Sequence, residues 1–464
     1  MSDIKNIFNI GQSALQAAKT NIEVTAQNIA HVNTPGYNKK EVILATKHIP
    51  RGSPYPFHGV EVIGIKRAYQ EELTSQIISQ QEESAYWQTK QEYLSTLEEV
   101  FNESDELGLN SDLNQFWNAW QKLSTDPNSH EERQEVISSA NQLAETFHSR
   151  AQNTLNILKN IKEDIGSVLN EINQILPKIA ELNQRIGEAA DNQAEEYKDQ
   201  LDKLIEDVSQ LVNINYWHEE NGQITLCING HPLVEGKNCY QLVSDVHDDG
   251  CITIQKRLAD GTSLQISDRI QGGKLKGLLE LNNEIIPDMV EKFDRLAFCL
   301  SQRVNELHQG GYGLDGTTGI YFFVPLASQN GAAQALALNP AFESNADLIA
   351  ASSSPEIANN ENALKLANLR QDPIITEGDV SWRANEYYSS FQRDIGRASK
   401  DSQTNTSHHH MILHNLQEKR SKVSDVALDE ELANLIKFQQ TYNASAKIIS
   451  TADEMMSTLL NLKA

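Results

Sequence analysis

The sequence predicts a mainly α-helical protein, with long coiled-coil helices at both termini, a helical bundle between them and a small inserted antiparallel β module. Three observations predict this fold class. Apolar residues near both ends recur at alternating spacings of four and three. A helical period continues through most of 68–212, whereas 213–267 alternates apolar and polar positions between hairpin signals.

These changes of period divide the 464 residues into segments. We expect an N-terminal helix, turn and short strands at 1–67, a helical bundle domain at 68–212 and the β module at 213–267. A helix and mixed loop region should follow at 268–380, and C-terminal helices, including the second coiled-coil helix, at 381–464.

The first predicted element is an amphipathic helix over 4–31. Its apolar seam consists of Ile4, Phe8, Gly11, Leu15, Ala18, Ile22, Thr25 and Ile29. Such a repeat keeps a narrow stripe against one partner helix.

A turn should end this helix. It consists of Asn33, Thr34, Pro35, Gly36 and Tyr37. Proline disfavours helical backbone in the preceding residue and glycine accepts a left-handed conformation, so a type II turn is expected at Pro35-Gly36. The β-branched segments 41–45 and 60–65 then read as short strands.

The bundle is predicted from two apolar faces. A broad aromatic face contains Leu113, Phe116, Trp117, Trp120 and Leu123. A second helix has a seam formed by Leu158, Ile165, Val168, Ile172, Ile175, Ile179, Leu182 and Ile186. Pro177 lies off that seam, and we expect a bend near residue 176.

The β module is predicted from alternating apolar residues and turn dipeptides. Ile224, Leu226 and Ile228 precede the hairpin signal Asn229-Gly230. Helix should resume over 275–308, with a bend at Pro287, and again from about 382. Between them, a strand is expected at 321–324 among loops and short helices.

The last helix has the same seam spacing as the first. Its apolar seam positions are Leu428, Leu432, Leu435, Tyr442, Ala446, Ile449, Met456 and Leu460. A long helix with one apolar stripe is not stable alone in water. Each terminal helix should therefore pair either with the other or with neighbouring copies, and under the second alternative both would be disordered in the free monomer.

Composition excludes several classes of function. The 39 basic and 64 acidic residues give a net charge of −25, which disfavours nucleic acid and anionic membrane surfaces as partners. No apolar stretch predicts a membrane span or a cleaved signal peptide. The four cysteines form no C-x-x-C pair and are expected to be buried free thiols.

No catalytic, cofactor-binding or metal site is predicted. His408, His409, His410 and His414 include an i, i+4 pair, but no Asp, Glu or Cys stands at ligand spacing, so a solvated polar face is favoured over a metal site. An extracellular enzyme carried between assembly helices would need a constellation of reactive residues at 213–400, and none is visible.

Residues 26–37, AQNIAHVNTPGY, resemble the N-terminal signature of the flagellar axial proteins, the family of rod, hook and hook-associated subunits. The run from Leu428 to Leu462 resembles the matching C-terminal signature. Rod and hook members usually carry Glu-Phe and Gln-Arg-x-Tyr there, whereas this chain has Asp429-Glu430-Glu431 and Phe438-Gln439-Gln440-x-Tyr442. The resemblance is therefore to the hook-associated members, although no outer β domain follows Phe323.

The resemblance implies a structural subunit, not an enzyme, that assembles as a ring through its terminal helices and joins the flagellar hook to the filament. The implied partners are copies of itself, the hook protein, the second junction protein and an export chaperone bound to the C-terminal helix. The implied location is extracellular, at the hook–filament junction, after type III export without a cleaved signal peptide. The alternative is another axial subunit, of rod or hook. The residues expected to carry self-association are the seam residues of both terminal helices.

Overall fold

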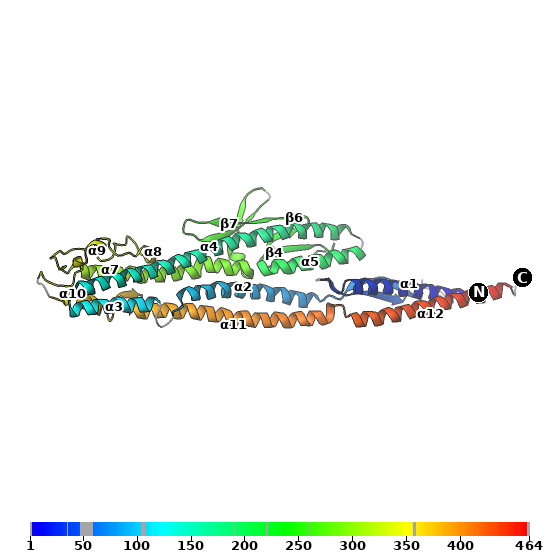
Figure 1. Ribbon diagram of the computed structural model, residues 1–464. Helices are drawn as coiled ribbons and strands as arrows, with labels where there is room; N and C mark the ends of the chain where they lie inside the picture. Colours follow the sequence, from blue (N-terminus) through cyan, green and yellow to red (C-terminus); the bar gives the residue numbers. More distant parts are fainter. Residues whose placement is uncertain are drawn as a thin grey trace.

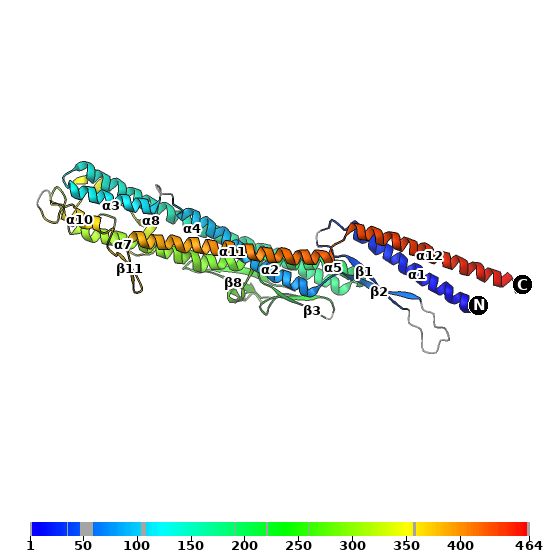
Figure 2. The ribbon, with the colours of Figure 1, turned by 90° about the horizontal axis from the view of Figure 1, so that it is seen from below.

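The computed structural model describes residues 2–34, 36–46, 59–103, 108–189, 191–219, 221–258, 260–355 and 359–461. The molecule is elongated, and both chain ends lie at the same end of it (Figure 1). There, helices α1 (Ser2–Ala30) and α12 (Leu428–Asn461) lie side by side and extend beyond the other elements. Figure 2 shows the same arrangement from below. The mainly α-helical fold class is confirmed.

A two-stranded ribbon accompanies the terminal helices. Strands β1 (Lys40–Thr46) and β2 (Val60–Arg67) pair antiparallel, and their register shifts between Ile43 and Leu44. The ribbon contacts α1 at Ser13, whose hydroxyl accepts a hydrogen bond from the Val60 amide at 3.2 Å. Both predicted strands are confirmed.

Long helices form the body of the molecule. They are α2 (Glu71–Phe101), α3 (Leu109–Thr125), α4 (His130–Glu188), α5 (Asp191–Leu211), α6 (Gly273–Glu280), α7 (Ile286–Gln309) and α11 (Ala384–Ser424). Helix α11 runs beside α2 and leads to α12 (Figures 1 and 2). The prediction that 68–212 is nearly all helix is confirmed.

Two prolines fall inside predicted helices, and the helix is regular at one of them but not at the other. Helix α4 continues through Pro177. Before Pro287, in contrast, a π-helical turn, η2 (Leu281–Ile285), separates α6 from α7. Pro287 thus lies directly after the π-helical turn, in the first turn of α7.

The aromatic face of α3 forms the centre of the distal core. Phe116, Trp117 and Trp120 are fully buried, and the ring of Trp120 lies 5.4 Å from that of Phe322. The strand predicted at 321–324 is wrong, because Phe323 makes only an isolated bridge to Leu338. Phe322 and Phe323 are both buried, whereas consecutive residues of a strand point to opposite faces.

The β module consists of two antiparallel sheets. Its strands are β3 (Asn215–His218), β4 (Ile224–Ile228), β5 (His231–Glu235), β6 (Asn238–Cys239), β7 (Gln241–Val246), β8 (Ile252–Arg257) and β9 (Ser263–Gln265). The first four strands form one sheet and the last three another. Asn229 and Gly230 have φ values of 41° and 87°, as the predicted hairpin turn requires. All five residues of β4 are buried, so this strand does not alternate as predicted.

Asparagines attach extended segments to the helices. In each case the side-chain amide of one asparagine makes two hydrogen bonds to the backbone of a single residue: its oxygen accepts from the N–H and its nitrogen donates to the C=O. The pairs are Asn173 with Leu242, Asn183 with Ile224, Asn283 with Ile252 and Asn305 with Phe323. Each amide replaces the hydrogen bonds of a missing neighbouring strand.

Short elements cover the end of the body opposite the termini. They are α8 (Ala332–Ala335), α9 (Ala341–Ser344), η3 (Ala346–Leu348), α10 (Glu361–Asn368), β10 (Ile375–Glu377) and β11 (Val380–Trp382), of which α8, α9 and α10 are labelled at that end in Figure 1. The remaining short element, η1 (Ser267–Arg269), lies beside β8 of the β module. Buried His308 holds two segments of this region: its Nδ1 lies 2.8 Å from the Ile320 carbonyl, and its Nε2 accepts from the Ala350 amide at 3.0 Å.

His308 should make the fold sensitive to acid. Burial lowers the pKa of His308 from 6.5 to about 4. Between these values the unfolded chain binds a proton that the folded chain does not, so the free energy of unfolding should fall as the pH drops from 6.5 to 4, by about 3 kcal/mol in total. Urea unfolding of the native chain and of His308→Gln across this range measures the effect. An unchanged pH slope in His308→Gln would contradict it, and His247→Gln, at an exposed histidine, is the control.

Candidate assembly site

The terminal helices form an antiparallel pair. Asn28, near the end of α1, lies beside Glu431 at the start of α12, whereas Gly11 lies beside Ile449. A Cβ at Gly11 would lie 2.9 Å from Cγ1 of Ile449, so the helices approach closely there. Pairing within one chain is the first of the two alternatives that the sequence left open.

The predicted seam of α1 faces α12. Ile4, Gly11, Ala18 and Thr25 are buried; Leu15, Ile22 and Ile29 are half-buried; Phe8 remains exposed near the chain end. These positions share one face of the helix.

The face of α12 that meets α1 differs from its predicted seam. Leu435, Ile449 and Met456 are half-buried, but Leu428, Leu432, Tyr442 and Leu460 are exposed. The buried positions are instead Glu431, Ser445 and Ala452. Small residues allow the backbones to approach, and a Cβ at Gly11 would lie 3.6 Å from the backbone carbonyl oxygen of Ser445. The role of the seam residues in association between copies therefore stays a prediction.

Asn28 joins four elements. Its Oδ1 accepts from the Lys40 amide at 3.0 Å and from the Tyr37 hydroxyl at 2.8 Å. Its Nδ2 donates to the Lys40 carbonyl at 2.9 Å and to Oε2 of Glu431 at 3.0 Å. One buried amide thus ties α1 to the turn, the ribbon and α12.

The turn motif is held by local contacts. The rings of His31 and Tyr37 stack with centroids 4.9 Å apart, and Nδ1 of His31 lies 3.2 Å from Oγ1 of Thr34. Gly36 has a φ of 81°, the left-handed conformation that the predicted type II turn needs. Pro35 lies outside the described residues, and Asn33 is exposed.

Arg67, at the end of the ribbon, attaches it to α5. Its guanidinium lies 3.1 Å from Glu195, 2.9 Å from Asp199 and 2.7 Å from Asp202. Burial raises the pKa of Asp202 to about 6, although Arg67 opposes this shift. Asn38 adds a hydrogen bond of 2.7 Å to Asp199.

The connection between α11 and α12 is attached to the residues that flank the β1–β2 ribbon. The Ser424 carbonyl accepts from the Lys39 amide at 2.8 Å, and the Ser424 hydroxyl donates to the Ala68 carbonyl at 2.7 Å. Lys39 also pairs with Glu431 at 3.2 Å. The terminal pair is therefore fixed to the body by polar contacts at its base, while its far end extends away from the body (Figure 2).

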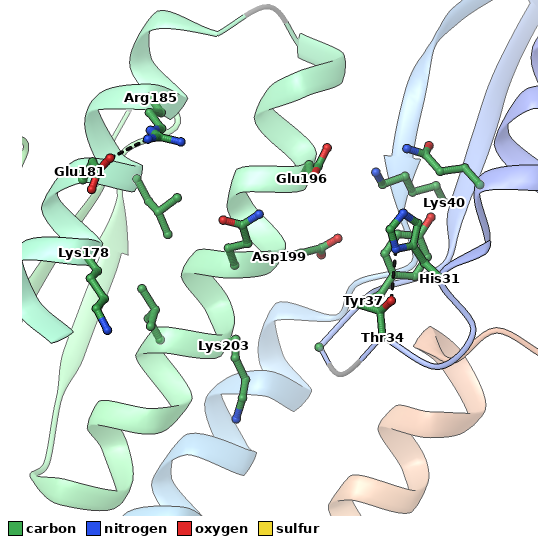
Figure 3. Close-up of a pocket in the computed structure, with 15 residues that line it drawn as sticks. His31, Thr34, Tyr37, Lys40, Lys178, Glu181, Arg185, Glu196, Asp199 and Lys203 are labelled. Atoms are coloured by element: carbon green, nitrogen blue, oxygen red, sulfur yellow. Dashed lines mark hydrogen bonds and ion pairs between the residues drawn. The ribbon is translucent and has the colours of Figure 1, made fainter. Parts of the chain in front are cut away.

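A cleft of about 470 Å³ separates the turn from α4 and α5. Figure 3 shows Asp199 pointing from α5 toward the turn, and Lys178, Glu181 and Arg185 on α4. Arg185 pairs with Glu181 at 2.6 Å, so much of this charge is neutralised locally.

Other sequence features are placed as follows. Across the described ranges, no three His, Cys, Asp or Glu side chains are grouped to hold a metal ion. His409 contacts Gln80, and His414 lies 3.8 Å from Glu418. The cysteines are free, but only Cys227 is buried; Cys239 is exposed, contrary to expectation. No helix in the described part of the chain is long and apolar enough to cross a membrane.

Family models match three parts of the chain. Residues 94–323 match the flagellar hook-associated protein FlgK helical domain. Residues 8–38 match the flagella basal body rod protein family, and residues 417–462 match the flagellar basal body rod FlgEFG protein C-terminal family. The two terminal matches cover most of α1 and all of α12.

Whole proteins match over nearly the full length. Flagellar hook-associated protein 1 of Bacillus subtilis is 27% identical over 97% of this chain and 96% of its own. The Salmonella typhimurium protein of that name is 23% identical over 99% of this chain and 100% of its own.

Among solved structures, the flagellar hook junction protein FlgK from Burkholderia pseudomallei covers 75% of this chain and 100% of its own, with a TM-score of 0.68. At 14% identity, this likeness supports the fold. From the matched termini, the helical domain between them and the full-length relatives, the chain belongs to the flagellar hook-associated protein 1 family.

Proposed function

We propose that this chain is a structural subunit of the bacterial flagellum that joins the hook to the filament. One observation carries the proposal: the two chain ends form a helical pair that extends beyond the body and leaves large apolar side chains exposed, among them Leu432, Ile436 and Met455. Exposed apolar surface of this kind is typical of protein–protein contacts. The family match gives the assembly to which these contacts belong.

The chain acts by assembly and not by catalysis. Copies associate as a ring through the terminal helices, and the hook protein and the second junction protein bind on either side of that ring. Two features support a mechanical role. Asn28 and Arg67 fix the base of the terminal helix pair, and the body consists of long helices that lie side by side and resist bending.

The exposed apolar side chains of α12 also bear on how the chain is exported. The chain leaves through the flagellar type III route, and a chaperone covers the C-terminal helix before export. The exposed side chains of α12 support this proposal, because they would otherwise associate in the cytoplasm.

Deleting residues 428–464 should abolish assembly, because it removes α12 and strips the buried face of α1. A strain that makes only the truncated chain should be non-motile and should release its filament protein into the medium. Motility and filament attachment measure this result. Deleting 462–464, which leaves α12 intact, is the control.

Chaperone binding should be lost in the same truncation. A pull-down of the flagellar export chaperone with the full-length and truncated chains measures it. Filament attachment by the truncated chain would contradict the structural proposal, and retained chaperone binding would contradict the export proposal alone.

A further inference from the structure

Arg133, in the first turn of α4, is a buried positive charge without an acidic partner. Its side chain is only 2% exposed. Nη1 donates to the Ile349 carbonyl at 2.6 Å and Nη2 to the Pro127 carbonyl at 2.7 Å, whereas Nε has no hydrogen-bond partner. Among the described residues, no carboxylate forms an ion pair with this guanidinium. Two neutral carbonyls therefore satisfy two of its donors and leave the charge itself unpaired.

An arginine cannot lose its charge on burial as other side chains do, because the guanidinium stays protonated in proteins. Burial lowers the pKa of Arg133, although Asp347 and Asp315 oppose this shift without pairing with it. Asp347 lies 3.6 Å from His130 instead, and Asp315 accepts hydrogen bonds from the amide and the hydroxyl of Thr317. A buried charge is normally paired, since an unpaired one destabilises the fold. Arg133 thus lacks an anion.

A cavity of about 20 Å³ adjoins Arg133. It is lined by the turn before α4 and by two stretches that are distant in sequence, 312–314 and 351–352. A volume of roughly 10–15 Å³ holds one water-sized guest, so the cavity has room for a monatomic ion and none for a phosphate group. The cavity also lies beside the N-terminus of α4, where the helix dipole favours negative charge.

We propose that this cavity binds a single chloride ion, held by the charge of Arg133 and by its Nε–H. The inference goes beyond the proposed function, because α3, α4 and α10 meet here at the end of the body opposite the terminal helix pair (Figure 1). The lining residues come together only when the chain folds, so the ion binds the folded chain alone and stabilises it. A water molecule fills the same space but leaves the charge unpaired.

Urea unfolding of the full chain tests the site in solution. Sodium chloride is exchanged stepwise for sodium gluconate at constant ionic strength, because gluconate is too large for the cavity. The equilibrium constant for unfolding should fall as chloride rises and should then level off. At a chloride concentration ten times the dissociation constant, it should be about tenfold lower than in gluconate. Sodium bromide should act as sodium chloride does. A general effect of salt on the chain does not saturate in this way.

Two variants should abolish the chloride response. Asn128→Asp places a carboxylate in the lining of the cavity, where it takes the place of the ion, so the equilibrium constant for unfolding should be the same in chloride and in gluconate. Arg133→Gln removes the charge, and if that chain does not fold, Asn128→Asp carries the test alone. Asn153→Asp is the matched control, because Asn153 is an exposed residue farther along α4, and it should respond to chloride as the native chain does.

Crystals of the native chain soaked in sodium bromide locate the ion. An anomalous peak in the cavity, in contact with Nε of Arg133, is expected. Peaks at exposed side chains alone, or an ordered water in the cavity, would show an adventitious ion only and overturn the inference.

The solution data can overturn it independently. A chloride response that does not level off, or one that Asn128→Asp retains, would do so. Glu356 is the one carboxylate between Pro355 and Asn359 in the sequence. A response that appears only in Glu356→Gln would identify that carboxylate, and not chloride, as the partner of Arg133.

Discussion

Replacing Asn28 by aspartate is expected to loosen the whole terminal module, although only one side-chain atom changes. The substitution removes the hydrogen bonds that Nδ2 donates to the Lys40 carbonyl and to Glu431. It also sets a second carboxylate where the Asn28 amide now lies 3.0 Å from Oε2 of Glu431, at a site where both residues are almost fully buried. Breaking a buried polar pair costs about 3–5 kcal/mol, and two facing carboxylates add repulsion.

The effect should be local, so amide hydrogen exchange measures it better than global unfolding. Exchange in α1, the ribbon and α12 should be faster by about two orders of magnitude or more, since each factor of ten corresponds to about 1.4 kcal/mol. Exchange in α4 should not change. The control is Asn21→Asp on the same helix, because the Asn21 amide donates within α1, to the Ala17 carbonyl at 2.8 Å. Equal exchange in the two variants would show that Asn28 does not hold the module together.

Replacing Gly273 by alanine is expected to destabilise the body of the molecule by a free energy of similar size. Gly273 begins α6 with a φ of 78°, which an L-residue adopts only at a cost of about 1–2 kcal/mol. An added Cβ would lie 2.5 Å from the backbone nitrogen of Val212 and 2.7 Å from the carbonyl carbon of Leu211. Backbone atoms cannot rotate away as a side chain can, so the end of α5 must shift. Overpacking of this kind costs about 1–3 kcal/mol more.

Urea unfolding of Gly273→Ala should therefore show a loss of about 2–5 kcal/mol in the free energy of unfolding. The same substitution at Gly166 should act in the opposite direction, because Gly166 lies within α4 and an added Cβ there meets no atom within 4 Å. Alanine in a helix interior is favoured over glycine by about 0.5–1 kcal/mol. Midpoints that move the same way in both variants would refute the steric argument.

Much of the fold could be predicted from the sequence because local chemistry determines it. The seam from Ile4 to Ile29 predicted α1, and Asn229-Gly230 predicted the hairpin between β4 and β5. The broad aromatic face from which the bundle was predicted lies on α3, and its residues are buried. Periodicity and turn chemistry act over a few residues, so they can be read in the chain itself.

The polar contacts of the candidate site could not be predicted in this way. Asn28 and Asn183 look like ordinary helix-surface residues, yet each bonds a backbone segment elsewhere in the chain. Arg67 and Asp202, which are 135 residues apart, become partners only when the ribbon meets α5. An asparagine or arginine has no period that marks it as buried, and its partner depends on the folded arrangement.

The sequence by itself determined that both ends of the chain are amphipathic helices that need a partner for their apolar stripe, because such a stripe is a property of residue order. Only the tertiary structure decided which face of α12 meets α1. Counting large apolar residues favours Leu428 and Leu432, whereas the close approach at Gly11 brings Ile449 and the backbone of Ser445 against α1. Helix packing depends on how near two backbones can come, and that distance is set jointly by both surfaces.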